Sequence, residues 1–331
     1  MSKKIMLSGI QPTGALHIGN YLGALKNWEN ILNEYYGFFF IADYHAITIE
    51  YDAKEMQKRI IDTAIEYLAC GLNLEKCSIF VQSDVEPHTE LAWIFNSIIP
   101  VAELERMTQY KDKSRKNAEN INAALLTYPS LMAADILLYQ ADVVPVGADQ
   151  KQHLEITRDI AERFNGIYGN VFTVPEPYIP KAGARIMSLQ NPSSKMSKSD
   201  PNPKGTVYLT DEPNVIMKKF KSAITDSEMS VHYAEGKDGI NNLMTIYSAV
   251  TGDSIETIEH DFSGKGYGDF KKAVGEAVVA ELEPVQKKYK ELLEDKKYLQ
   301  QCWSEGADTA SRIANRTLSK VMKKVGFLPK A

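Results

Sequence analysis

Short, continuously apolar runs alternate with amphipathic stretches along the first half of the chain. The apolar runs, each of which ends at Gly or Asp, occupy Lys4–Gly9, Tyr36–Asp43, Cys77–Asp84 and Asp142–Gly147. Such runs are typical of strands that are buried on both faces of a parallel sheet. Helical periodicity between them predicts helices over Ile18–Tyr35, Ala53–Cys70 and His88–Ile99, and a further one that includes LMAADILLYQ. This alternation predicts an α/β fold with a parallel sheet and right-handed crossovers.

The second half has a different pattern, because helical periodicity dominates after Thr206–Glu212. The run EAVVAELEPVQKKYKELLEDKKYLQQ predicts a helix that is expected to break at Pro284. Another helix is predicted in TASRIANRTLSKVMKKVGF, with a buried stripe that comprises Ala310, Ile313, Ala314, Leu318, Val321 and Val325. Its cations recur every four residues and therefore share one exposed face, namely Arg312, Arg316, Lys320 and Lys324. A mainly α-helical second half is therefore expected.

The composition is that of an ordinary globular protein, with 44% hydrophobic and 24% charged residues among 331. This length predicts two domains. No apolar run reaches the length of a membrane span, and the N-terminal run is too short for a signal peptide, so we expect a cytoplasmic protein. The three cysteines form no metal-binding pattern. A net charge of −5 with a basic C-terminal segment fits a polyanionic partner that must be released.

Candidate chemistry lies at the carboxyl ends of the predicted strands, where parallel sheets bind their ligands. After the first strand, GIQPTGALHIGNYLGA combines a turn with a helix start. Its glycines allow a ligand to approach the backbone, its free N–H groups favour an anion, and His17 and Asn20 are spaced to face one ligand. The alternative is a plain turn in which His17 caps the helix. The spacing matches neither a dinucleotide-binding fingerprint nor a Walker P-loop.

Two further stretches contain candidate residues. In VGADQKQH, at the end of the fourth strand, Asp149 could accept a hydrogen bond from a ribose and Gln150 could bind a polar group. A helix N-cap is the alternative for Asp149. In YPSLMAADILLYQ, Asp135 lies among apolar residues, where a carboxylate is costly to bury without hydrogen bonds. It could accept a hydrogen bond from an apolar ligand, but periodicity alone favours the solvent side of the helix.

The polar stretch PSSKMSKSDPNPKG follows the α/β half. Its Lys195 and Lys198 could clamp a triphosphate, with the serine hydroxyls as additional donors, and Met196 would dock on an apolar surface. The alternative is a solvated linker, which is the usual role of such a composition.

Three motifs therefore occur in order: H-x-G-N, G-x-D-Q and K-M-S-K-S. Together they resemble class I aminoacyl-tRNA synthetases, in which the first motif ends in His where this chain has Asn20. HAIT, ELERMTQYKDKS and LLTYPSLMAADILLYQADVVPVGADQKQH extend the resemblance to the bacterial-type tryptophanyl-tRNA synthetases, over nearly the whole chain. The resemblance implies a Rossmann-like catalytic domain over residues 1–190, a mobile K-M-S-K-S loop over 191–205 and a helical, anticodon-binding domain over 206–331.

The resemblance also implies activation of tryptophan by ATP, with release of pyrophosphate, and transfer of tryptophan to the 3′ end of tRNA(Trp). ATP would bring Mg²⁺ as a substrate complex, and no metal held by the protein is expected. Positioning and charge stabilisation would carry the chemistry, with Lys195, Lys198, His17 and Asn20 as catalytic residues. A homodimer is implied, and its interface is expected within Leu91–Gln109, ordinary core being the alternative.

Two sets of binding residues follow from the resemblance, motif by motif. The ATP set comprises Gln11, Pro12, Thr13, Gly19, Asn20, Gly147, Ala148, Asp149, Ile186, Lys195, Met196, Ser197, Lys198, Ser199 and Lys113. For Lys113 and its neighbour Lys111, a solvated helix end is the alternative. The tryptophan set comprises Asp135 as the acceptor of the indole N–H, with Met132, Tyr128, Gln150, Val144, Val146 and His45. A buried acceptor suits indole, which only donates.

Three other functions stay open on the sequence. A tyrosyl-tRNA synthetase would share the architecture, but it would need groups for a phenol and has a different signature loop. A non-tRNA adenylyltransferase would share a turn of the H-x-G-H type but is usually shorter. A catalytically silent, RNA-binding paralogue is disfavoured by the intact motifs.

Overall fold

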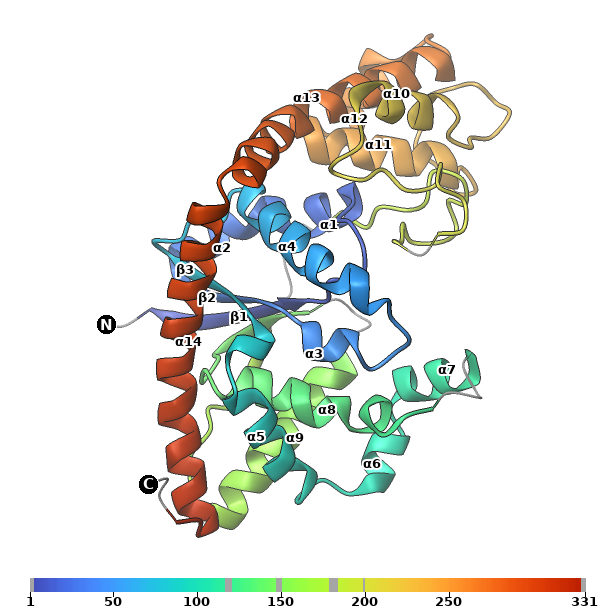
Figure 1. Cartoon of the computed structure of the whole chain (residues 1–331). Helices are drawn as coiled ribbons and strands as arrows, with labels where there is room; N and C mark the ends of the chain where they lie inside the picture. Colours follow the sequence, from blue (N-terminus) through green and yellow to red (C-terminus); the bar gives the residue numbers. More distant parts are fainter. Residues whose placement is uncertain (1–2, 117–120, 147–150, 179–183, 199, 329–331) are drawn as a thin grey trace.

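The structure is a computed structural model that describes residues 3–116, 121–146, 151–178, 184–198 and 200–328. The described residues form a five-stranded parallel sheet in the order β3-β2-β1-β4-β5 (Figure 1). Its strands are β1 (Lys4–Ile10), β2 (Tyr35–Ile41), β3 (Cys77–Val81), β4 (Val143–Pro145) and β5 (Glu176–Tyr178). The predicted α/β fold with a parallel sheet is thereby confirmed.

The sequence predicts four of these strands and misses β5. The missed strand has only the residues EPY, of which Glu176 and Pro177 are exposed. A short edge strand that contains a proline carries no apolar run, so its pattern does not differ from that of a loop.

Helices cover both faces of the sheet. In the α/β half they are α1 (Ile18–Gly23), η1 (Leu25–Asn27), α2 (Trp28–Glu34), α3 (Asp43–Ala46), α4 (Ala53–Ala69), η2 (Gln82–Asp84), α5 (Pro87–Asn96), α6 (Val101–Glu105), α7 (Thr108–Lys116), α8 (Ala123–Leu137) and α9 (Lys151–Tyr168). The single helix predicted over Ile18–Tyr35 is divided, because Ala24 leaves the helical region with φ −143° and ψ −58°. The stretch LMAADILLYQ lies mostly in α8, which begins at Ala123.

The helices of the second half are α10 (Pro213–Lys221), α11 (Asp238–Thr251), α12 (Ile255–Asp261), α13 (Tyr267–Glu294) and α14 (Lys296–Val325). The break predicted at Pro284 is wrong, because α13 continues through it. Leu282 and Val285 beside it are buried, and their packing outweighs the one backbone N–H that a proline lacks. Along the described residues, no helix combines the length and the apolar character that a membrane span requires.

The two faces of the sheet contribute to two separate cores. Met6 and Phe39 pack with α1, α2 and α4 on one face, whereas Leu7 and Phe38 pack with α5, α8 and α9 on the other. This division follows from the period of two along a strand. The first core also contains Met196 of the K-M-S-K-S segment and continues into α10–α13, so it joins the two halves of the chain.

Helix α14 runs along one side of the molecule and packs against β3, an edge strand of the sheet (Figure 1). At Gly306 the helix lies so close to the backbone of Ile79 that a Cβ would collide with it. In the predicted stripe, Ala310, Ala314, Leu318 and Val321 are buried, and Ile313 and Val325 are partly buried. The four predicted cations of its other face are exposed. The C-terminal helix therefore packs against the α/β half, and the domain boundaries stay a prediction.

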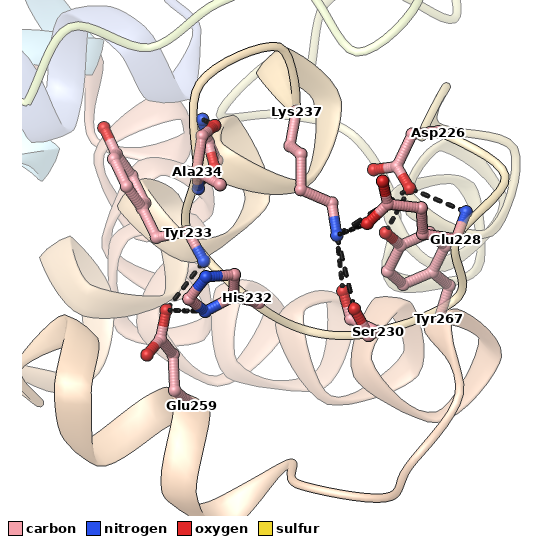
Figure 2. Close-up of polar contacts among 10 residues, drawn as sticks. Asp226, Glu228, Ser230, His232, Tyr233, Ala234, Lys237, Glu259 and Tyr267 are labelled. Atoms are coloured by element: carbon pink, nitrogen blue, oxygen red, sulfur yellow. Dashed lines mark hydrogen bonds and ion pairs between the residues drawn. The ribbon is translucent and has the colours of Figure 1, made fainter.

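A polar network holds the segment between α10 and α11 (Figure 2). Lys237 Nζ lies 2.9 Å from a Glu228 carboxylate oxygen and donates to the carbonyl of Ser230 at 3.2 Å. Tyr267 of α13 donates to Asp226 at 2.6 Å. The Lys237 contacts thus tie the segment to itself, and the Tyr267 hydroxyl attaches it to α13.

Candidate active site

A cavity of about 390 Å³ opens at the carboxyl end of the sheet, where the sequence predicts ligand binding. Strands β1 and β4, the end of β2, and helix α8 supply most of its walls. Its lining contains six of the seven residues of the predicted tryptophan set, namely Asp135, Met132, Tyr128, Val144, Val146 and His45. The seventh, Gln150, lies outside the described residues.

Asp135 is the chemical centre of this cavity. Its side chain is 1% exposed, so the solvent-side position that periodicity favours is wrong. Its Oδ1 accepts a hydrogen bond from Gln82 at 2.6 Å and lies 2.6 Å from His88 Nδ1, and its Oδ2 lies 2.7 Å from His45 Nε2. These partners come from three other segments, so tertiary contacts replace the water that the carboxylate loses.

The same partners set the charge of Asp135. Burial alone would raise the pKa of its carboxyl, but His45 and His88 outweigh burial and lower the pKa to about 2. His88, which is fully buried, also lies 2.7 Å from the hydroxyl of Tyr139 through its second ring nitrogen. The cavity therefore presents a fixed carboxylate at neutral pH.

Four residues of this region are absent from the sequence-based set. Gln82 and His88 hold Asp135, His153 lies 2.6 Å from the Tyr128 hydroxyl, and Gln109 lines the cavity. Gln82 follows the third strand directly, and His153 ends the quoted stretch VGADQKQH, so strand-end polarity could have indicated both. No comparable signal marks His88, since it lies within a helix.

The H-x-G-N turn brings His17, Gly19 and Ile186 together. A Cβ added at Gly19 would lie 2.9 Å from His17 Nδ1 and 3.6 Å from the Cβ of Ile186, so any larger residue would force the His17 ring to move. Asn20 accepts a hydrogen bond from the His17 backbone N–H at 3.2 Å. Among the described residues, His17 Nδ1 has no hydrogen-bond partner. Burial, aided by Lys198 and Lys195, lowers the pKa of His17 to about 4, so the ring is neutral at pH 7.

The K-M-S-K-S segment is packed against this turn. Met196 is 2% exposed, as its predicted docking requires, so a fully solvated linker is the wrong interpretation. Lys198 donates to the carbonyl of Gly14 at 2.8 Å, and Lys195 is exposed. The carbonyl of Ser197 accepts a hydrogen bond from Thr206 at 2.9 Å.

The turn and the segment after the signature loop are also joined through the backbone. Ile18 donates to the carbonyl of Val207, and Leu209 donates to that of Leu16, both at 2.9 Å. These hydrogen bonds join chain segments that are nearly two hundred residues apart in the sequence.

The remaining predicted residues divide into two groups. Gln11 lines the cavity, Pro12 is buried and Thr13 is exposed. Outside the described residues lie Gly147, Ala148, Asp149 and Ser199, and the side chain of Lys113 on α7.

Comparison with known proteins agrees with this architecture. Residues 2–283 match the family described as tRNA synthetases class I (W and Y). The tryptophan–tRNA ligase of Clostridium tetani is 54% identical over 327 residues, which cover 99% of this chain and 97% of the relative.

Solved structures are similar over the same length. The tryptophanyl-tRNA synthetase from Mycoplasma pneumoniae has a TM-score of 0.90 at 35% identity, with 99% of both chains covered. That from Campylobacter jejuni, complexed with ADP and tryptophan, has a TM-score of 0.86 at 35% identity, with 98% of this chain and 100% of that chain covered. The resemblance inferred from the motifs is thereby confirmed, and the chain belongs to the class I tRNA synthetases for tryptophan and tyrosine.

Proposed function

We propose that this enzyme is specific for tryptophan and charges tRNA(Trp) in two steps. In the first step, the carboxylate of L-tryptophan attacks the α-phosphorus of ATP, and the bond between this phosphorus and the oxygen that bridges to the β-phosphorus breaks. Pyrophosphate departs, and tryptophanyl-adenylate is formed. In the second, a ribose hydroxyl at the 3′ end of the tRNA attacks the carbonyl carbon, and AMP leaves. The observation that carries the proposal is the buried, ionised Asp135 in a cavity whose walls include the apolar side chains of Met132, Val144 and Val146.

The geometry of Asp135 explains how indole would be selected. A carboxylate offers about four acceptor positions, and three are used by Gln82, His88 and His45. The position that remains suits the indole N–H, which donates and cannot accept. The ring itself would lie against Met132, Val144 and Val146. A ligand without the donor would leave the carboxylate short of a partner, which is heavily penalised.

ATP is proposed to bind beside this cavity, over Gln11, Pro12, Thr13, Gly19, Asn20 and Ile186, with Gly147, Ala148, Asp149, Ser199 and Lys113 completing the site. Lys195 and Lys198 would stabilise the charge that develops on the leaving pyrophosphate. The neutral His17 ring can serve as a hydrogen-bond partner without adding charge. Mg²⁺ would enter with ATP. The described residues contain no group of three or more His, Cys, Asp or Glu placed to bind a metal.

The helical half is proposed to bind tRNA in the cytoplasm, with the cationic face of α14 as a candidate for phosphate contacts. The most direct test of the whole proposal is exchange of pyrophosphate into ATP, measured with tryptophan and tyrosine in parallel. We expect exchange with tryptophan and little with tyrosine. Exchange with tyrosine alone would replace the proposal by the tyrosine-specific alternative, and exchange with neither would refute amino-acid activation.

We also propose a homodimer formed through the face around Trp93. Trp93 and Val101 are 77% and 57% exposed, whereas Phe95 and Ile99 between them are buried, so the predicted interface segment leaves two apolar side chains uncovered in the single chain. Trp93→Glu is therefore expected to produce monomers in sedimentation analysis. Ile167→Glu, at another exposed apolar position, is the matched control. A wild-type monomer, or an unaltered dimer in the Trp93 variant, would contradict this interface.

A further inference from the structure

Glu66 is a buried carboxylate to which neither the sequence motifs nor the proposed mechanism assigns a role. It lies on α4, among the residues that pack on one face of the sheet, and it is 2% exposed. Glutamates are almost never fully buried without a partner, because the charged form loses its hydration. Both of its oxygens face the backbone N–H of Leu16, at 3.2 and 3.1 Å.

The group that Glu66 binds belongs to the turn that leads into the H-x-G-N motif. Lys198 of the K-M-S-K-S segment holds the same turn, since it donates to the carbonyl of Gly14 at 2.8 Å. Gly14 has a φ of +136°, a conformation that glycine adopts readily and other residues rarely adopt, so this turn depends on glycine at position 14. Residues 14–16 are therefore held by an acid from α4 and by a base from the signature segment.

We propose that Glu66 is a positioning residue for ATP, which together with Lys198 fixes the turn 14–16 and thereby the following His17. This inference rests on the proposed function, because it assumes that ATP phosphates lie beside His17 and Lys198. Glu66 would not touch the nucleotide. It acts through the Leu16 backbone and through its charge, which favours the protonated form of Lys198.

The electrostatics of the pair agree with this role. Burial lowers the pKa of Lys198, and Glu66 opposes that decrease. Burial raises the pKa of Glu66 from 4.5 to about 7, while the Leu16 N–H and Lys198 act in the opposite direction. Glu66 also interacts electrostatically with Asp62 and Tyr67 on α4, with Cys70 directly after that helix, and with Tyr289 on α13.

Titration of Glu66 is expected to change the stability of the fold and the affinity for ATP in opposite directions. Since the folded pKa lies above the unfolded value, Glu66 costs folding free energy as pH rises from about 4.5 to about 7. ATP binding, by contrast, should improve over the upper part of this range, because the carboxylate becomes charged. A carboxyl with only a structural role would show no such gain in ATP binding.

The test compares Glu66→Gln with Glu66→Leu. Glutamine retains an oxygen for the Leu16 N–H but has no charge, whereas leucine removes both. We expect Glu66→Gln to weaken ATP binding about fivefold at pH 8, and Glu66→Leu roughly tenfold or more, as for a lost hydrogen bond to a charged group. The KM for tryptophan should change less than twofold, and the thermal stability of Glu66→Gln at pH 8 should equal or exceed that of the wild type.

Binding of Mg·ATP is measured by calorimetry between pH 6 and pH 8, and exchange kinetics give the two KM values. Thr63→Val is the matched control, since Thr63 is buried one turn earlier on α4 and its hydroxyl donates to the Arg59 carbonyl of the same helix. The inference is overturned if Glu66→Gln has the wild-type affinity for ATP across this range, if both KM values rise equally, or if Thr63→Val has the same effect. Because calorimetry needs no amino acid, its result is separate from the question of whether tryptophan is the substrate.

Discussion

The proposed tryptophan cavity and the proposed nucleotide side of the site are built in different ways. In the cavity, Asp135 of α8 is held by His88 of α5 and by Gln82 and His45, which belong to the short helices that follow β3 and β2. On the nucleotide side, by contrast, the turn 14–18 is held by residues from α4, from the K-M-S-K-S segment and from 207–209. One region is preorganised within the α/β half, and the other depends on how the two halves meet. Selectivity for the amino acid and activation of ATP should therefore be separable by mutation.

The largest effect is expected from Lys198→Met. Loss of the cation that is proposed to stabilise the leaving pyrophosphate should lower kcat for exchange by roughly 100-fold to 1000-fold, while the KM for tryptophan stays near the wild-type value. Steady-state exchange kinetics check both values. Lys204→Met, at an exposed position shortly after the signature motif, is the control and should be close to wild type. A rise in the KM for tryptophan as large as the loss in kcat would mean that the two regions are not separable.

The next largest effect is expected from Asp135→Asn, which alters the proposed tryptophan cavity. Loss of the charged acceptor should lower kcat/KM for tryptophan about 100-fold, with little change in the KM for ATP. Asp142→Asn is a matched control, because the Asp142 carboxylate also accepts a hydrogen bond, in its case from the Ile5 backbone N–H at 2.7 Å, but it precedes β4 and does not line the cavity. Thermal unfolding of both variants separates a binding defect from a folding defect. Unchanged tryptophan kinetics in Asp135→Asn would place amino-acid recognition elsewhere.

The smallest effect is expected from His17→Gln, on the pH dependence of the unfolding free energy. This variant alters only the proposed nucleotide side. His17 has a folded pKa of about 4 against an ordinary value of 6.5, so it opposes folding increasingly as pH falls between these values. His17→Gln should remove up to about 2.5 kcal/mol of the decrease in unfolding free energy that the wild type shows between pH 7.5 and pH 4.5. Chemical denaturation at the two pH values checks this difference. An equal loss in both proteins would show that His17 is not held neutral by its surroundings.

Local pattern was sufficient for the elements whose burial is continuous. The apolar runs of β1, β2 and β3, the amphipathic α4 and the stripe on α14 were all predictable, because each pattern has the period of its own structure. The local pattern did not predict β5, the division of the helix expected over Ile18–Tyr35, or the continuation of α13 through Pro284. At Pro284, the packing of the buried Leu282 and Val285 compensates for the unfavourable helix propensity of proline, which the sequence does show.

By itself, the sequence determined the α/β class, the family and the three motifs, because these depend on residue types at short, regular spacings. Only the tertiary structure decided that Asp135 is buried, that Gln82 and His88 hold it, and that Glu66 and Lys198 hold one turn. Each of these contacts joins residues that are far apart along the chain. Whether a carboxylate is hydrated or paired depends on which distant groups the fold brings to it, and no local period encodes that choice.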